Sequence, residues 1–173
     1  MSEHETALTH NIQMKSFDPG TFLGESWTIW KGPIDGGGLS GEEDIDPRSL
    51  ALSQIEITKF LFETCLKTGE NWITGEERLR RLEEKPSFIR FGGNVFLGLW
   101  LDYQANGRDS ALEAIYRSRG IKFLAFFGLV LRSPEGRRAV LCFCRFGGGK
   151  WDWHYLWLVY QWNAYRPSAG CAS

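Results

Sequence analysis

The sequence predicts an α+β domain that ends in a β meander. Its middle third carries two helix starts, each marked by a hydroxyl residue with a glutamate three positions later, at Thr74–Glu77 and Ser110–Glu113. Its C-terminal third carries three extended apolar segments, residues 121–131, 138–146 and 151–162, which turn-forming residues separate. Helices in the middle and strands at both ends favour α+β over a doubly wound sheet.

Composition indicates one compact domain, predicted over residues 17–173, because 173 residues with 43% hydrophobic content can bury a sizeable core. Residues 1–16 are polar and are predicted to be a disordered tail. They hold no apolar run typical of a signal peptide, so we expect a cytoplasmic protein or export by a non-classical route. The net charge of −1, with basic residues spread along the chain, argues against a nucleic-acid partner. The longest apolar stretch, residues 123–131, is too short for membrane insertion.

Before the first capping box, the pattern predicts strands around a long loop. A first strand is expected over residues 22–30, followed by an irregular glycine-rich and acidic loop over residues 32–48. Partial alternation over residues 50–58 predicts a short strand, and apolar residues at helical spacing over 61–66 predict a helix after it.

The middle third is predicted to contain helices. One helix begins after Thr74 and ends before Pro86. Residues 94–104 are so uniformly apolar that helix and buried strand remain equal alternatives. The helix that begins after Ser110 has a clear end, because Gly120 occupies the position where a left-handed cap is common.

Known catalytic, metal and phosphate motifs are missing from the sequence. Its cysteines form no CxxC pair, and we expect them to be free thiols: Cys65, Cys142, Cys144 and Cys171. His154 is the only histidine outside the tail, and we expect a packed or surface residue there rather than a Cys–His dyad. The acidic run at residues 42–46 offers oxygen ligands but lacks the spacing of a known calcium loop. The sequence therefore predicts neither a catalytic residue nor a metal or other cofactor.

The most unusual segment is the aromatic run over residues 151–166. Its tryptophans suit a buried core, whereas tryptophan, tyrosine and arginine together are also typical of binding hot spots. Both interpretations hold at once if the tryptophans point inward, because neighbours on a strand face opposite sides.

The pattern in and around this run resembles a known family. Trp151-x-Trp153, Trp157-Leu158, Trp162-x-Ala164 and Pro167-Ser168-Ala169 follow Val140–Arg145 and a glycine turn. Together with residues 27–33, 41–49 and 91–106, this pattern is similar to variable proteins of diversity-generating retroelements. The resemblance implies a C-type-lectin-like fold of the formylglycine-generating-enzyme-like subclass, with a hypervariable ligand-binding region at about 141–166. Glu56-Ile57-Thr58 resembles an element near the start of that fold.

The resemblance also implies which residues vary, because these retroelements mutate template adenines, typically in asparagine codons. Tryptophan has a codon without adenine, so the scaffold is predicted to be Trp151, Trp153, Trp157 and Trp162. Nine residues can arise from an asparagine codon and are the candidate ligand-binding sites: Asp152, His154, Tyr155, Leu156, Val159, Tyr160, Asn163, Tyr165 and Arg166. Gln161 requires a different template codon. We expect the four tryptophans to be mostly buried and most of the nine sites to be exposed.

These observations predict a binding protein, not an enzyme, whose partner is a protein or another macromolecule. Two alternatives stay open. Gly24-Glu25-Ser26-Trp27 near the first strand suggests a small β-barrel carrier of the lipocalin type for an apolar ligand. The second alternative is a cysteine-dependent enzyme related to formylglycine-generating enzymes, which would use Cys142 or Cys144.

Overall fold

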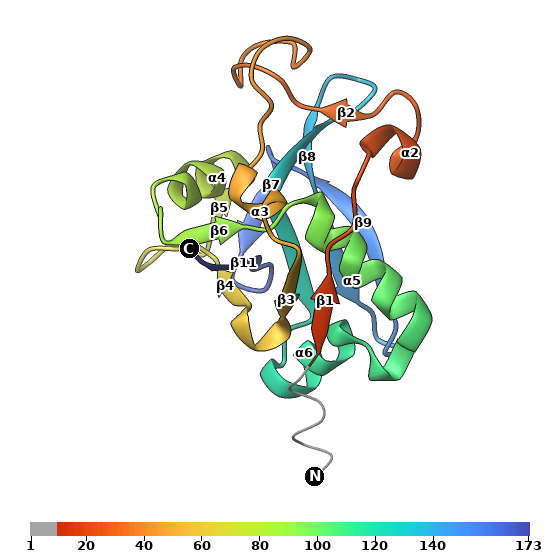
Figure 1. Cartoon of the computed structure of the whole chain (residues 1–173). Coiled ribbons are helices and arrows are strands. Elements are labelled where there is room, and N and C mark those ends of the chain that lie inside the picture. Colours follow the sequence, from red (N-terminus) through yellow and green to blue (C-terminus); the bar gives the residue numbers. More distant parts are fainter. Residues whose placement is uncertain (1–9) are drawn as a thin grey trace.

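The computed structural model describes residues 10–173, and its longest strand, β7 (Phe123–Arg132), lies at the centre of the fold (Figure 1). Every residue of β7 before its last is apolar or glycine, which suits a strand covered on both faces. It pairs antiparallel with β8 (Arg138–Arg145), which pairs antiparallel with β9 (Trp151–Trp157). The predicted C-terminal β meander is therefore confirmed.

The rest of the main sheet comes from distant parts of the chain. The last strand, β11 (Ser168–Ala172), runs parallel to β7 and antiparallel to β4 (Leu61–Glu63) and β6 (Phe88–Arg90). A short strand, β2 (Thr28–Ile29), pairs with the end of β7. The strand order β4-β11-β7-β8-β9 leaves β9 at one edge. This mixed helix-and-sheet architecture confirms the α+β class.

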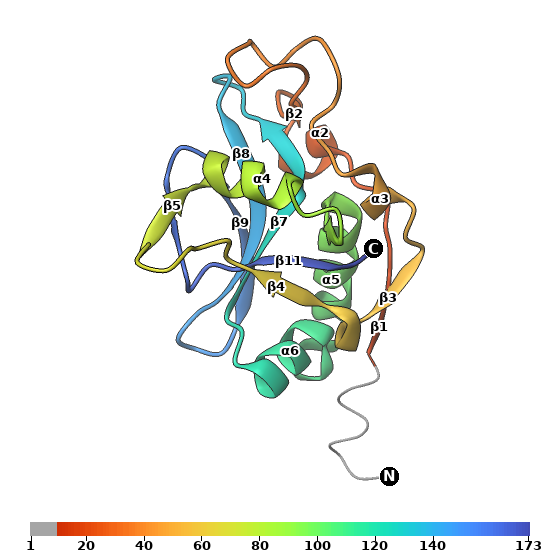
Figure 2. The same cartoon turned by 90° about the vertical axis from the view of Figure 1, so that its left-hand side faces the viewer.

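Helices and short strands cover the two faces of the meander (Figure 2). On one face lie α5 (Gly93–Asn106) and α6 (Ala111–Arg119). On the other lie α4 (Gly75–Glu83) and a two-stranded antiparallel sheet, which pairs β5 (Trp72–Thr74) with β10 (Gln161–Asn163). Two apolar clusters result, one on each face, and successive residues of β7 and β8 alternate between them.

The hydroxyl half of each predicted capping box forms, whereas the Glu77 and Glu113 side chains bind Arg80 and Arg145 instead. The Thr74 hydroxyl accepts a hydrogen bond from the Glu77 backbone N–H at 3.1 Å, and the Ser110 hydroxyl accepts one from the Glu113 N–H at 3.3 Å. Gly120 ends α6 in the left-handed conformation, with φ of 69°. The ambiguous segment 94–104 lies within helix α5.

Three predictions for the N-terminal half are wrong. The tail does not extend to residue 16, because β1 (Asn11–Gln13) pairs with β3 (Gln54–Glu56) and buries Ile12; residues 1–9 lie outside the described part. The expected strand over 22–30 is reduced to β2, because Asp18 caps a helical turn, α2 (Pro19–Leu23). The expected helix over 61–66 is strand β4, because pairing with β11 outweighs local periodicity.

The predicted strand over 151–162 is also divided. It breaks after Trp157 into a turn, and β10 leaves the main sheet to pair with β5. The elements not yet described are short helical turns: α3 (Pro47–Leu50), η1 (Ile57–Lys59) and η2 (Gly107–Asp109). The loop predicted over residues 32–48 is irregular except where α3 begins.

Candidate functional site

Strand alternation in β9 separates the aromatic run into two sets. Its odd-numbered side chains pack on the α5 side of the sheet: Trp151, Trp153, Tyr155 and Trp157. Its even-numbered side chains face the α4 side: Asp152, His154 and Leu156. The second set shares its face with Cys142 and Cys144 of β8, which lie opposite His154 and Asp152.

Tyr155 belongs to the scaffold side rather than to the predicted variable surface. Its ring lies 4.6 Å from Trp27 and 5.3 Å from Trp157, measured between ring centroids. The adenine-based argument concerns codons and carries no information about which strand face a residue occupies. Tyr155 therefore lies on the face of β9 opposite to His154 and is left out of the surface described below.

The four predicted scaffold tryptophans are buried to different degrees. Trp151 and Trp162 are 3% and 0% exposed. Trp153 and Trp157 are partly buried and pack at the margin of the apolar cluster on the α5 side. The Trp153 ring packs at 4.7 Å from Phe22, and the Arg137 guanidinium stacks at 3.9 Å on Trp157.

Trp162 anchors the segment that follows β9. Its ring packs edge-on against Phe127 at 5.1 Å, on the α4 side of the sheet. In the β5–β10 pair, Trp162 lies opposite Ile73, and both point inward. Their neighbours in each strand consequently point outward, which places Trp72 beside Asn163 on the surface.

A buried arginine holds the same segment by its backbone. The guanidinium of Arg78, which is fully buried, donates hydrogen bonds to the backbone carbonyls of Arg166 and Asn163, the latter at 3.1 Å. It also donates to the Ser168 hydroxyl at 3.3 Å and lies over the Trp162 ring at 5.3 Å. Because the acceptors at 163 and 166 are carbonyls, these bonds do not depend on which side chains stand there.

The start of α4 supports the turn in the same manner. The Gly75 N–H donates to the Tyr160 carbonyl at 3.2 Å, and the Glu76 N–H donates to the Leu158 carbonyl at 3.0 Å. A side chain at Gly75 would place its Cβ 2.8 Å from the Leu158 Cα, so this close approach requires glycine. Backbone contacts therefore fix the turn over residues 158–160.

None of the nine candidate variable residues is buried. Four are exposed: Asp152, Val159, Tyr160 and Tyr165. Five are half-buried: His154, Tyr155, Leu156, Asn163 and Arg166. The exposed set is smaller than the majority that the coding argument predicts, and three of the half-buried residues lie on β9, which packs on both of its faces.

The protein surface around β10 and the turn before it contains a hollow. The hollow measures about 700 Å³, and four of the nine candidate residues line it: Val159, Tyr160, Asn163 and Arg166. The rest of its lining is Asn71, Trp72 and Gln161. The sequence reasoning missed Asn71 and Trp72, and it left Gln161 outside the nine candidates because that residue requires a different template codon. The first two come from β5 and its preceding turn, which only tertiary pairing brings beside β10.

The Phe123 ring contacts both a residue of β9 and a residue that lines the hollow. The His154 ring lies edge-on to the Phe123 ring at 6.0 Å, and the Arg166 guanidinium lies over the same ring at 5.8 Å. The surface formed by the outward residues of β9, the turn, β10 and Arg166 is called the display surface below. It contains every candidate variable residue except Tyr155: Asp152, His154, Leu156, Val159, Tyr160, Asn163, Tyr165 and Arg166.

The cysteines beside the display surface are not arranged as a catalytic pair with His154. The Cys142 thiol donates to the backbone carbonyl of His154 at 3.3 Å and not to its imidazole. Burial raises the pKa of Cys142 well above its ordinary value, and it also raises the pKa of Cys144. Protonated thiols are poor nucleophiles and poor metal ligands. All four cysteines are free.

The imidazole of His154 should make stability depend on pH. Burial lowers the pKa of His154, the charge of Arg166 lowers it further, and Asp152 acts in the opposite direction. As the pH falls, the His154 imidazole is therefore protonated at a higher pH in the unfolded chain than in the folded one, and this protonation favours unfolding. The stability that is present above the unfolded pKa of about 6.5 is lost as the pH falls through the lower folded pKa.

We expect urea midpoints to fall between about pH 7.5 and about pH 5.5, and to fall less in His154→Gln. Acidic groups with lowered pKa values, such as Glu113 beside Arg145, lose their contribution only at lower pH. An equal fall in the wild type and in the variant would contradict this assignment.

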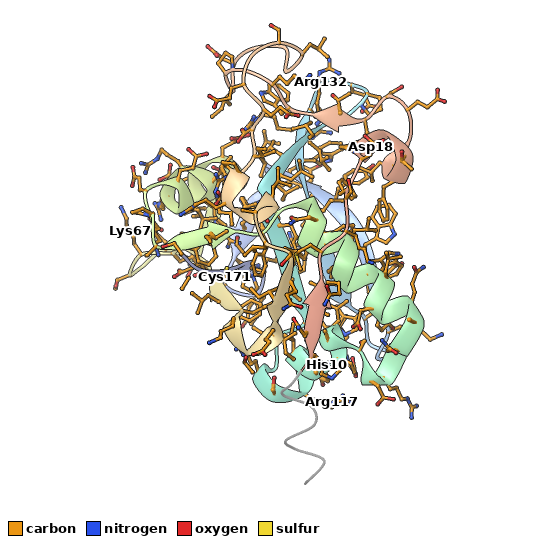
Figure 3. All side chains as sticks on the ribbon, viewed as in Figure 1. His10, Asp18, Lys67, Arg117, Arg132 and Cys171 are labelled. Carbon is orange, nitrogen blue, oxygen red and sulfur yellow. The ribbon has the colours of Figure 1, made fainter. Side chains whose placement is uncertain are left out.

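The acidic run of the N-terminal loop is used in ion pairs. Asp44 accepts from Arg138 at 2.9 Å, and Asp46 accepts from Arg48 at 2.9 Å. Within residues 10–173, no three histidine, cysteine, aspartate or glutamate side chains gather as a metal site. Charged side chains such as Asp18, Lys67, Arg117 and Arg132 project from separate parts of the surface (Figure 3).

The main sheet is open and carries helices on both faces, which contradicts the lipocalin-like alternative. In the part of the chain from residue 10 onward, each helix is too short or too polar to cross a membrane. Comparison of the chain with protein-family models, with curated proteins and with solved structures found no match.

Proposed function

We propose that this protein is a ligand-binding display protein whose variable surface is the display surface, as in the variable proteins of diversity-generating retroelements. The observation that carries the proposal is the way residues 158–166 are held. Arg78, Gly75 and Glu76 bind backbone atoms of this segment, and Trp162 supplies its buried side chain. The outward side chains are therefore free to change without loss of the contacts that position the backbone.

A surface that must accept many sequences requires side chains that do not take part in holding the backbone. A site that tolerates many residues cannot depend on one of them for packing. Tyr165 is 86% exposed and Val159 is 64% exposed, so neither contributes to the core. The C-type-lectin-like fold of the formylglycine-generating-enzyme-like subclass is part of this proposal, and the helices α5 and α6 followed by the β7–β9 meander are compatible with it.

The proposed ligand is a protein or another macromolecule, bound without a cofactor. Exposed aromatic residues and an arginine gather on the display surface, and these residue types carry most of the energy of protein interfaces. The proposal includes no catalytic role. The near absence of clustered basic residues favours a partner other than nucleic acid.

A pair of randomised libraries tests the proposal. One library varies four exposed display residues: Asp152, Val159, Tyr160 and Tyr165. The matched library varies four buried residues in and around the same segment: Arg78, Trp151, Leu158 and Trp162. With each library displayed on cells and challenged with protease, we expect most members of the first library and few members of the second to remain folded.

Equal survival of the two libraries would contradict the display proposal, because it would mean that the outward side chains matter for folding as much as the anchors do. The DNA that flanks the gene gives an independent test. We expect a near-repeat of the 3′ coding end that differs at adenines, beside a reverse transcriptase gene. Flanking DNA that lacks both would remove the retroelement part of the proposal.

A further inference from the structure

The hollow of the display surface carries a positive charge, Arg166, that forms no ion pair with the residues the structure describes. Its lining contains neither aspartate nor glutamate, and Arg166 is its only charged residue. Among residues 10–173, Arg166 has no carboxylate within salt-bridge distance. Directly behind it, Arg78 is a buried cation held by carbonyls and a hydroxyl. Burial, together with the charge of Arg166, lowers the pKa of Arg78 to about 10, so Arg78 remains protonated at neutral pH.

The other half of the hollow is aromatic and apolar. Trp72 is 46% exposed, Tyr160 is 48% exposed and Val159 is 64% exposed. Trp72 is the cross-strand neighbour of Asn163, so its indole is fixed beside the residues that follow β9. Partly exposed aromatic side chains next to an arginine resemble the composition of interface hot spots.

We propose that the hollow binds an acidic peptide segment, with a ligand carboxylate on the Arg166 guanidinium and an adjacent apolar or aromatic side chain on Trp72 and Tyr160. The proposal rests on the proposed function, because it takes the display surface to be the binding face. An arginine and a carboxylate form paired, charge-assisted hydrogen bonds. A single unpaired cation suits one carboxylate, whereas a nucleic-acid backbone requires several basic residues along its path.

The geometry also divides the hollow into a constant part and a changing part. Asn71 and Trp72 lie outside the segment 141–166, so they stay the same when that segment is diversified. Residue 166 is one of the candidate variable positions, and its charge therefore selects the charge of the partner. In this chain, where residue 166 is arginine, the selected partner is acidic.

The test uses a capped tetrapeptide of three glutamates and one phenylalanine, titrated into the full chain while the Trp72 indole N–H is followed by NMR. The control peptide replaces the glutamates by glutamines, and an oligothymidine of similar length represents nucleic acid. We expect the acidic peptide to shift the Trp72 signal and to bind at least about tenfold more tightly than either control, because hydrogen bonds to a charged group are worth more than neutral ones. Arg166→Gln should lower that affinity by about tenfold, and Arg166→Lys should lose less.

A matched control variant is Arg117→Gln, which removes an exposed arginine from α6, on the opposite face of the sheet from β5 (Figure 2). It should bind the acidic peptide as the wild type does. The inference is overturned if the glutamine peptide or the oligothymidine binds as tightly as the acidic peptide, if no probe binds, or if Arg117→Gln loses as much affinity as Arg166→Gln.

The outcome can be separated from that of the proposed function. The protease-resistant fraction of the two libraries requires no peptide and reports only whether the display residues are decoupled from the fold. Tolerant display positions without acidic-peptide binding would defeat this inference alone. Intolerant display positions with acidic-peptide binding would defeat the display proposal and leave the acidic-peptide site standing.

Discussion

Trp162→Ala should lower the free energy of unfolding by about 3–5 kcal/mol, the range for truncating a fully buried large aromatic side chain. The Trp162 side chain is 0% exposed and packs on Phe127 and beneath the Arg78 guanidinium. Its loss would open a cavity between the sheet and α4, and it would release the only inward side chain of β10. Denaturant unfolding at equilibrium measures the change.

Tyr160→Ala is the matched control, two residues away in the same segment. The Tyr160 side chain is half-exposed, and the contact that holds this residue is made by its backbone carbonyl. We expect a loss under about 1 kcal/mol. Trp157→Ala should fall between the two, because Trp157 is only partly buried. Equal midpoints for Trp162→Ala and Tyr160→Ala would show that the segment is not divided into anchor and display residues.

Arg78→Met should cost about 3 kcal/mol, although it removes a buried charge. Methionine keeps the apolar stem of the side chain but leaves the carbonyls of Asn163 and Arg166 without their donor, at about 1–3 kcal/mol each. Relief of the desolvated guanidinium offsets part of this loss. We also expect faster amide hydrogen exchange over residues 163–166, because the segment loses its attachment to α4.

Arg80→Met on the same helix provides the control. Arg80 pairs with Glu77 and Glu84 on the surface, where exposed ion pairs contribute less than about 1 kcal/mol. Arg78→Met could prove as stable as Arg80→Met, with unchanged amide exchange at residues 163–166. That result would mean that the free-energy cost of burying the Arg78 guanidinium equals the stability gained from its hydrogen bonds. In that case Arg78 would not be needed to hold the display segment.

The fold could be predicted from the sequence wherever the signal is local. Thr74 and Ser110 each cap a helix by a bond to a residue three positions away, and Gly120 ends a helix through its own conformational freedom. The meander was recognisable because long apolar runs alternated with turn residues. The helical state of residues 94–104 was not recognisable, because a uniformly apolar segment has no periodicity to distinguish helix from strand.

The candidate site was predicted in part. The run of tryptophans indicated an aromatic segment in which Trp151 and Trp162 are buried as expected, but only four of the nine candidate variable residues are exposed. The packing of Tyr155 on the α5 side could not be predicted, because the coding argument contains no information about which face of β9 a residue occupies. Trp72 was missed because nothing in its own neighbourhood marks it, and it enters the hollow only through the pairing of β5 with β10.

The sequence by itself determined the α+β class, the two capped helices, the meander and the aromatic segment, since capping bonds and side-chain periodicity act between residues close in the chain. Only the tertiary structure decided that residues 61–63 are a strand, that Arg78 holds the carbonyls of Asn163 and Arg166, and that Trp72 lines the hollow. Each of these depends on partners far away in the sequence. Their bonds and contacts exist only after the chain has closed those long loops, so no local pattern records them.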